Sequence, residues 1–164
     1  TGCCHVCIFG GNNISRPILG EINMELYIGG FAQGKLEYVT NKYNCAKVYD
    51  GKNYKNLIQN IENKMITEKI VILDHFNDII KNLFESELEN AVCNAERLTE
   101  WLICSEEKHK YKLVIISDEI GCGIVPMEKL ERGYRECCGR MLIKLADRAD
   151  IVERIICGLP QKIK

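Results

Sequence analysis

Residues 24–35 read MELYIGGFAQGK, a short apolar run followed at once by a glycine-rich turn that ends in lysine. The turn has the spacing G-x-x-x-x-G-K. Its glycines let backbone N–H groups converge on phosphate oxygens, the following helix start adds a positive dipole end, and the lysine reaches the terminal phosphates. The alternative is a strand-to-helix turn that binds nothing. We predict a nucleotide-binding phosphate loop made of Gly29, Gly30, Phe31, Ala32, Gln33, Gly34, Lys35 and Leu36.

The residue after the lysine departs from this pattern. Phosphate loops of this kind carry Ser or Thr there, and its hydroxyl ligates Mg²⁺. Leu36 stands in that place and cannot bind a cation. If Mg²⁺ accompanies the nucleotide, it must be held by phosphates, water and a carboxylate elsewhere in the chain.

The rest of the chain alternates strand and helix signals. Continuous apolar runs at 70–73 and 113–116 are typical of strands buried on both faces of a parallel sheet. Shorter strands are predicted at 24–28, 46–49 and 151–157, and helices at 34–41, 54–65, 84–105 and 126–149. This alternation predicts one α/β domain over residues 24–164, a mostly parallel sheet with helices on both faces.

Residues 1–23 lack periodicity, and we interpret them as an N-terminal extension, native or not. They hold a Cys-Cys-His-x-Cys run at 3–7, which lacks the C-x₂-C loop that usually wraps zinc. The seven cysteines after residue 23 have no regular spacing, so we expect most of them to be buried small hydrophobes rather than disulfide partners.

Composition excludes several classes of function. The 164 residues are 46% apolar and 27% charged, with a net charge of −1, which is typical of a soluble globular protein. A nucleic-acid surface is not expected because it needs clustered Lys and Arg. No run approaches the roughly 18 apolar residues of a membrane span, and the first 23 residues do not read as a secretory signal. We therefore expect a cytoplasmic protein.

Acidic residues follow both strongly apolar strands. Asp74 comes directly after the run 70–73, in the position of a carboxylate that orients Mg²⁺ or its water, although a helix N-cap is an equal alternative. Asp118 and Glu119 follow the run 113–116 and could serve a metal, a substrate hydroxyl or only a solvated turn. We predict Lys35, Asp74 and Glu119 as catalytic residues and Asp74 as the metal ligand. We interpret His75 as a structural residue.

Residues 117–126, SDEIGCGIVP, resemble the bifunctional adenosylcobinamide kinase / adenosylcobinamide-phosphate guanylyltransferase family of cobalamin biosynthesis. The resemblance extends to the phosphate loop and to Leu73-Asp74, Asn82-Leu83, Arg132, Arg135, Gly139-Arg140, Leu145-Ala146, Ala149-Asp150 and Gly158-Leu159-Pro160. It implies a RecA-like P-loop domain of a kind that often assembles as a homotrimer, and an enzyme that phosphorylates the aminopropanol hydroxyl of adenosylcobinamide with ATP or GTP and Mg²⁺. It also implies a second reaction, GMP transfer from GTP through a guanylyl-histidine.

Two further departures bear on that second reaction. The family carries its guanylylated histidine between the phosphate loop and the next acid, whereas residues 38–69 contain no histidine. The family tends to place an Asn-Gln pair two residues after Gly139-Arg140, and here Leu142 and Ile143 stand in those positions. The sequence thus favours the kinase reaction over guanylyl transfer. The alternative is a non-catalytic nucleotide- or corrinoid-binding module of the same fold.

Overall fold

The computed structural model describes residues 24–86, 88–109 and 111–164. The predicted extension at 1–23, with its Cys-Cys-His-x-Cys run, lies outside the described residues. Along the chain the elements are β1 (Glu25–Gly29), α1 (Lys35–Lys42), β2 (Lys47–Asp50), the 3₁₀ turn η1 (Gly51–Asn53), α2 (Tyr54–Glu62), β3 (Ile70–Asp74), α3 (Phe76–Ser86), α4 (Ala91–His109), β4 (Lys112–Asp118), α5 (Lys129–Arg148), β5 (Ile151–Ile156) and β6 (Leu159–Lys162).

The strands form one sheet in the order β2-β3-β4-β1-β5-β6. All neighbours are parallel except β5 and β6, which form an antiparallel hairpin at the edge. The register sets Gly29 beside Asp118 and Asp50 beside Asp74. The predicted mostly parallel α/β fold is confirmed. Because β1, β3 and β4 run parallel, the turns that follow them lie together at the carboxyl ends of the strands.

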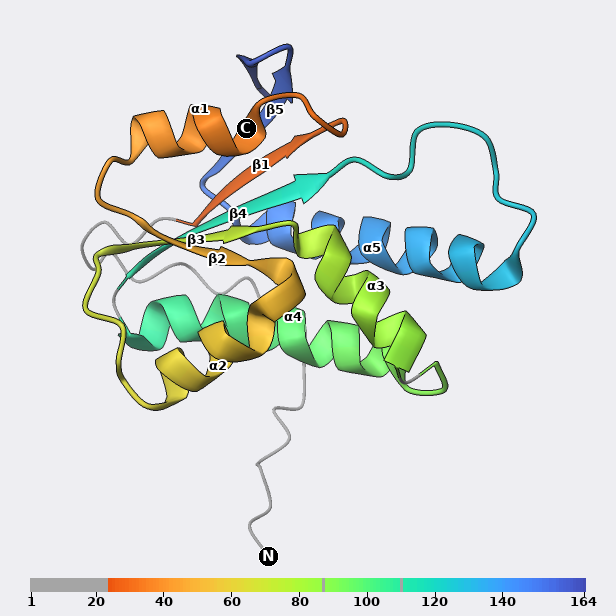
Figure 1. Ribbon diagram of the computed structural model, residues 1–164, viewed down its shortest axis with the longest axis horizontal. Helices are drawn as coiled ribbons and strands as arrows, with labels where there is room; N and C mark the ends of the chain where they lie inside the picture. The colour runs from red at the N-terminus through yellow and green to blue at the C-terminus, as the bar shows by residue number, and fades with distance from the viewer. Residues whose placement is uncertain (1–23, 87, 110) are drawn as a thin grey trace, which may run out of the picture.

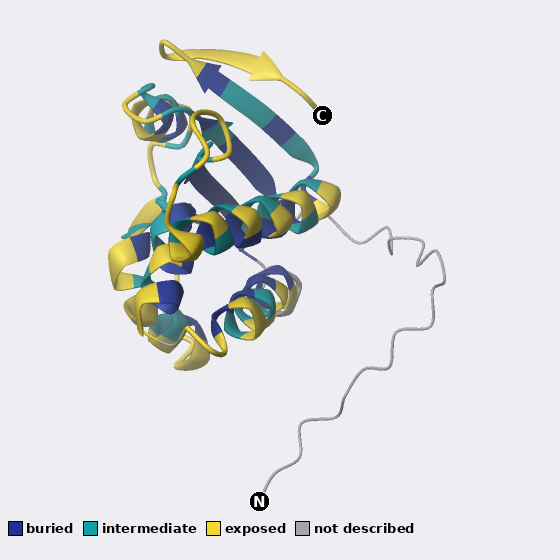
Figure 2. Ribbon diagram, turned by 90° about the vertical axis from the view of Figure 1, so that its right-hand side faces the viewer, coloured by how far each residue is buried: buried dark blue, intermediate teal, exposed yellow. Residues whose placement is uncertain are grey.

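Helices cover the two faces of the sheet unequally (Figure 1). On one face, Val39 of α1 packs with Tyr27, Ile72, Val114, Ile116 and Ile155 in a small core. The larger core on the other face is built by α2, α3, α4 and α5 over side chains such as Leu26, Leu73 and Leu113. Figure 2 shows buried central strands and an exposed β6. In the part of the chain that the structure describes, no helix has both the length and the apolarity to cross a membrane.

Several helix boundaries differ from the sequence prediction. The helix expected at 84–105 is two helices, because α3 ends at Ser86 and α4 starts at Ala91. Leu88, in the middle of that predicted helix, lies in the connection and is largely exposed. The helix expected from 126 begins at Lys129, and β6 was not predicted.

The prediction that most cysteines are buried is wrong for the described residues. Cys137 and Cys138 on α5 are buried. The other described cysteines are exposed, because they lie in loops or on the solvent sides of helices: Cys45, Cys93, Cys104, Cys122 and Cys157. All seven are free thiols.

Candidate nucleotide-binding site

The predicted phosphate loop connects β1 to α1, as expected. Gly34 is the N-cap of α1 and has a φ of 77°, a left-handed conformation in which a side chain would be strained. It supplies no side chain to cap the helix, so the first N–H groups of α1 remain available to an anion. A Cβ on Gly29 would overlap the carbonyl oxygen of Ile155, which explains why glycine begins the loop beside β5.

Lys35 lies under this loop rather than in open solvent. Its Nζ donates to the carbonyl oxygen of Gly30 at 2.8 Å and to Oδ1 of Asp118 at 2.6 Å. The side chain is only 8% exposed. The ammonium is therefore positioned in advance between the loop and the end of β4, where a phosphate on the loop would compete with Asp118 for it.

Asp118 is held in place by two helices. Its backbone N–H donates to Oδ1 of Asn77 at 3.0 Å, and the carbonyl oxygen of Asn77 accepts from the hydroxyl of Tyr134 at 3.2 Å. Asn77 is buried in the first turn of α3. Sequence reasoning considered Asp118 but did not pair it with Lys35, and it missed Asn77, which no motif or periodicity marks.

Asp74 lies on β3, separated from β1 by β4, and Lys35 hydrogen-bonds to Asp118 instead. Burial raises the pKa of Asp74 above its usual value. Its Oδ1 accepts from the backbone N–H of His75 at 2.9 Å, and its Oδ2 lies 3.2 Å from Nδ1 of His75. Nδ1 of His75 is nevertheless buried without a hydrogen-bond partner among the described residues, so the structural interpretation of that histidine stays a prediction.

The acidic side chains offer a partial rather than a complete metal site. Among the described residues, no group of three or more His, Cys, Asp or Glu side chains is arranged to hold a metal ion. Mg²⁺ commonly takes only one or two protein carboxylates and fills its other positions with phosphates and water. A single carboxylate at the carboxyl end of β3 therefore fits Mg²⁺ bound together with a nucleotide.

Glu119 joins the loop to β5. Its backbone N–H donates to the carbonyl oxygen of Gly29 at 2.8 Å. Its Oε2 accepts from Nε of Arg154 at 2.9 Å and lies 2.8 Å from Nη2 of the same guanidinium in an ion pair. Sequence reasoning missed Arg154, although a charged pair inside the apolar strand IVERII is a visible signal.

The remaining loop residues face outward or toward the β5–β6 turn. Oε1 of Gln33 accepts from the N–H of Cys157 at 2.7 Å, and its carbonyl oxygen accepts from Gly158 at 2.9 Å. Phe31 is 82% exposed and Leu36 is partly exposed. The structure therefore brings the phosphate loop, Asp118 and Glu119 together and sets Asp74 at the end of the strand beyond β4.

Comparison with known proteins finds sequence matches to one family. The family model described as cobinamide kinase / cobinamide phosphate guanyltransferase matches residues 47–163. That range runs from β2 into the end of the chain and includes Asp74, Asp118 and Glu119, while the phosphate loop precedes it.

Two curated relatives bear the same name, bifunctional adenosylcobalamin biosynthesis protein CobU. The protein from Salmonella typhimurium is 38% identical over 63 residues, 38% of this chain and 35% of that protein. The protein from Escherichia coli is 30% identical over 94 residues, 57% of this chain and 51% of that protein. The matched segments thus span about a third and about half of the two relatives.

The family match covers well over half of this chain, and it confirms the resemblance carried by residues 117–126. The chain belongs to the cobinamide kinase / cobinamide phosphate guanyltransferase family.

Proposed function

We propose that this protein is a nucleotide-dependent kinase that transfers the γ-phosphoryl group of ATP or GTP to the aminopropanol hydroxyl of adenosylcobinamide. The observation that carries the proposal is the buried ammonium of Lys35, held between the phosphate loop and Asp118. Family membership in cobalamin biosynthesis supports the choice of acceptor.

We assign a separate role in phosphoryl transfer to the phosphate loop with Lys35, to Asp74 and to Glu119. The N–H groups of the loop and of α1, with Lys35, stabilise the negative charge that spreads over the transferring phosphoryl oxygens. Asp74 would be the carboxylate that holds Mg²⁺, and the ion would neutralise negative charge on the nucleotide phosphates. We assign to Glu119 the positioning of the acceptor hydroxyl, whose oxygen bonds to the γ-phosphorus as the bond to the bridging oxygen breaks and the hydroxyl proton passes to water.

Guanylyl transfer is left out of the proposal because its nucleophile has no counterpart here. Residues 38–69 contain no histidine. His75 is the histidine at this edge of the sheet, and its Nδ1 lies 3.2 Å from Asp74 on the metal-binding side of the site. The homotrimer and the cytoplasmic location implied by the sequence remain predictions.

The test is a phosphate-transfer assay with adenosylcobinamide, Mg²⁺ and γ-labelled ATP or GTP in separate reactions, beside α-labelled GTP to detect labelled protein. We expect labelled corrinoid and no labelled protein. Label on the protein would show that a histidine outside the expected segment performs guanylyl transfer. Triphosphate binding without any transfer would overturn the kinase proposal.

A non-catalytic binding module is the second candidate, and Leu36 is the observation that favours it. Leu36→Ser restores the hydroxyl of the usual motif, and the position is exposed enough to accept serine without loss of a core contact. For a kinase we expect a higher transfer rate at low Mg²⁺, because the hydroxyl adds a ligand. Leu36→Ala is the matched control, and no gain with serine over alanine favours the binding module.

A further inference from the structure

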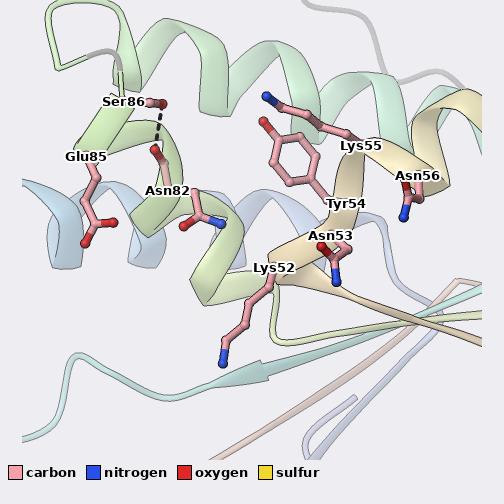
Figure 3. A pocket seen from close by; sticks show the side chains of 8 residues that line it. All are labelled: Lys52, Asn53, Tyr54, Lys55, Asn56, Asn82, Glu85 and Ser86. Atoms are coloured by element: carbon pink, nitrogen blue, oxygen red, sulfur yellow. Dashed lines mark hydrogen bonds between the residues drawn. The ribbon is translucent and has the colours of Figure 1, made fainter.

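A polar cavity of about 540 Å³ lies between α3 and the η1–α2 segment, outside the phosphate loop (Figure 3). Lys52, Asn53, Tyr54 and Lys55 line it from one side, and Asn82 and Glu85 line it from α3. In Figure 3 the side chains of Asn82 and Tyr54 extend from their elements into the space between them. The cavity thus lies between two segments that each follow a strand: η1–α2 follows β2, and α3 follows β3.

This cavity opens beside the proposed catalytic edge. η1 starts at Gly51, where a Cβ would overlap the carbonyl oxygen of His75, so the segment packs directly against the end of β3. Asp50 fixes that start, because its Oδ1 accepts from the N–H of Lys52 at 2.9 Å. Since β2 is three strands from β1 and neighbouring strands lie about 4.8 Å apart, the carboxyl end of β2, where η1 starts, lies about 14 Å from that of β1.

The lining is rich in groups that both donate and accept hydrogen bonds. Asn amides and the Tyr54 hydroxyl each donate and accept hydrogen bonds. Glu85 offsets part of the positive charge that Lys52 and Lys55 bring to the lining. No described residue hydrogen-bonds to the side-chain amide of Asn82, while its carbonyl oxygen accepts from Oγ of Ser86 at 2.7 Å. That amide is therefore available to a ligand.

We propose that this cavity binds the carboxamide side chains on the periphery of the corrinoid acceptor, with Asn82 as the central recognition residue. The proposal rests on the proposed function, since it takes the acceptor to be adenosylcobinamide. Carboxamides match the lining because they too donate and accept. β3 and β4 lie between β2 and β1 in the sheet, so a macrocycle held at this cavity would lie over their ends as its hydroxyl arm reaches toward Lys35.

The test measures binding of adenosylcobinamide by equilibrium dialysis without nucleotide, so that acceptor binding is separated from phosphate transfer. The variants are Asn82→Ala, Asn53→Ala, the double variant, and Lys52→Gln with Lys55→Gln. Lys81→Ala is the matched control, since Lys81 is exposed on α3 and does not line the cavity. Circular dichroism and triphosphate affinity check that each variant is folded.

Each lost amide contact is expected to weaken corrinoid binding about fivefold, and the Asn53→Ala/Asn82→Ala double variant more than tenfold. The charge variant and Lys81→Ala are expected to stay within about threefold. Asparagine variants that bind like the wild type would overturn the proposal, and so would a collapse confined to the lysine variant or a wild type that binds no corrinoid. Loss of binding in Asn82→Ala, together with a wild type that transfers no phosphate, would support the cavity and contradict only the kinase.

Discussion

An ion pair lies at each end of the neighbouring strands β1 and β4, and the two pairs differ in what surrounds them. At the carboxyl end, Nζ of Lys35 lies 2.6 Å from Asp118, and at the amino end Nζ of Lys112 lies 2.6 Å from Glu25. Glu25 is further bonded by the hydroxyls of Tyr27 and Tyr43, each at 2.6 Å. The amino end is thus a closed network, whereas the carboxyl end adjoins a glycine-rich loop.

The difference shows how one kind of ion pair can serve structure or ligand binding. Glu25 is 1% exposed, and burial alone would raise its pKa, but the bonds from Lys112, Tyr27 and Tyr43 outweigh burial and keep the pKa below its ordinary value. Such a pair must keep its partners, because an uncompensated buried charge is costly. In the proposed function Lys35 exchanges Asp118 for a phosphate, since the loop above it would supply N–H groups for the same anion.

The largest expected effect comes from Lys35→Ala, which removes the cation at the carboxyl end. Triphosphate affinity should fall at least about 100-fold, because a charged hydrogen bond contributes up to about 3 kcal/mol and Asp118 would then repel the phosphate. Isothermal titration calorimetry measures the affinity, and circular dichroism should show an intact fold. Unchanged affinity would contradict the phosphate-loop assignment.

Lys112→Ala breaks the pair at the amino end and should lower the free energy of unfolding by about 2–3 kcal/mol. A fully buried pair would lose more, but Lys112 is partly exposed. Urea denaturation measures this loss, and nucleotide affinity below the unfolding transition should match the wild type. If Lys112→Ala weakened nucleotide binding as much as Lys35→Ala, the two ends would not have separate roles.

The sequence predicts the carboxyl end better than the amino end, for physical reasons. A phosphate loop needs glycines and a lysine at fixed spacing, so residues 29–35 predict one without reference to any partner residue. Glu25 and Lys112 are far apart in the chain and meet only through parallel register, and neither residue belongs to a local pattern. Asn77 was missed for the same reason, since it meets Asp118 only in the folded chain, whereas Arg154 did leave a signal in the strand IVERII but nothing in the sequence names Glu119 as its partner.

The next largest effect is the pH dependence of stability that Glu25 gives to the amino end. Because the pKa of Glu25 is lowered in the folded chain, the unfolded chain binds more protons between that value and the ordinary 4.5, so stability rises with pH in this window and is lost as pH falls through it. Glu25→Gln removes this term, at most about 1.4 kcal/mol per pH unit. Urea midpoints from pH 3 to pH 6 (roughly the range around this window) should converge for wild type and variant as pH falls. Parallel curves would contradict the pKa shift.

The smallest expected effect is at Gln33, which ties the phosphate loop to the β5–β6 turn. Gln33→Ala loses the bond from Cys157 N–H to Oε1, which at this exposed position contributes about 0.5–1 kcal/mol. Because the bond holds the loop rather than the core, the loss should appear as a weakening of triphosphate affinity of about two- to fivefold, with little change in the urea midpoint. Gln161→Ala, on exposed β6, is the matched control. A lower urea midpoint with unchanged triphosphate affinity would instead show that Gln33 contributes to stability, as the Glu25 network does, and not to nucleotide binding.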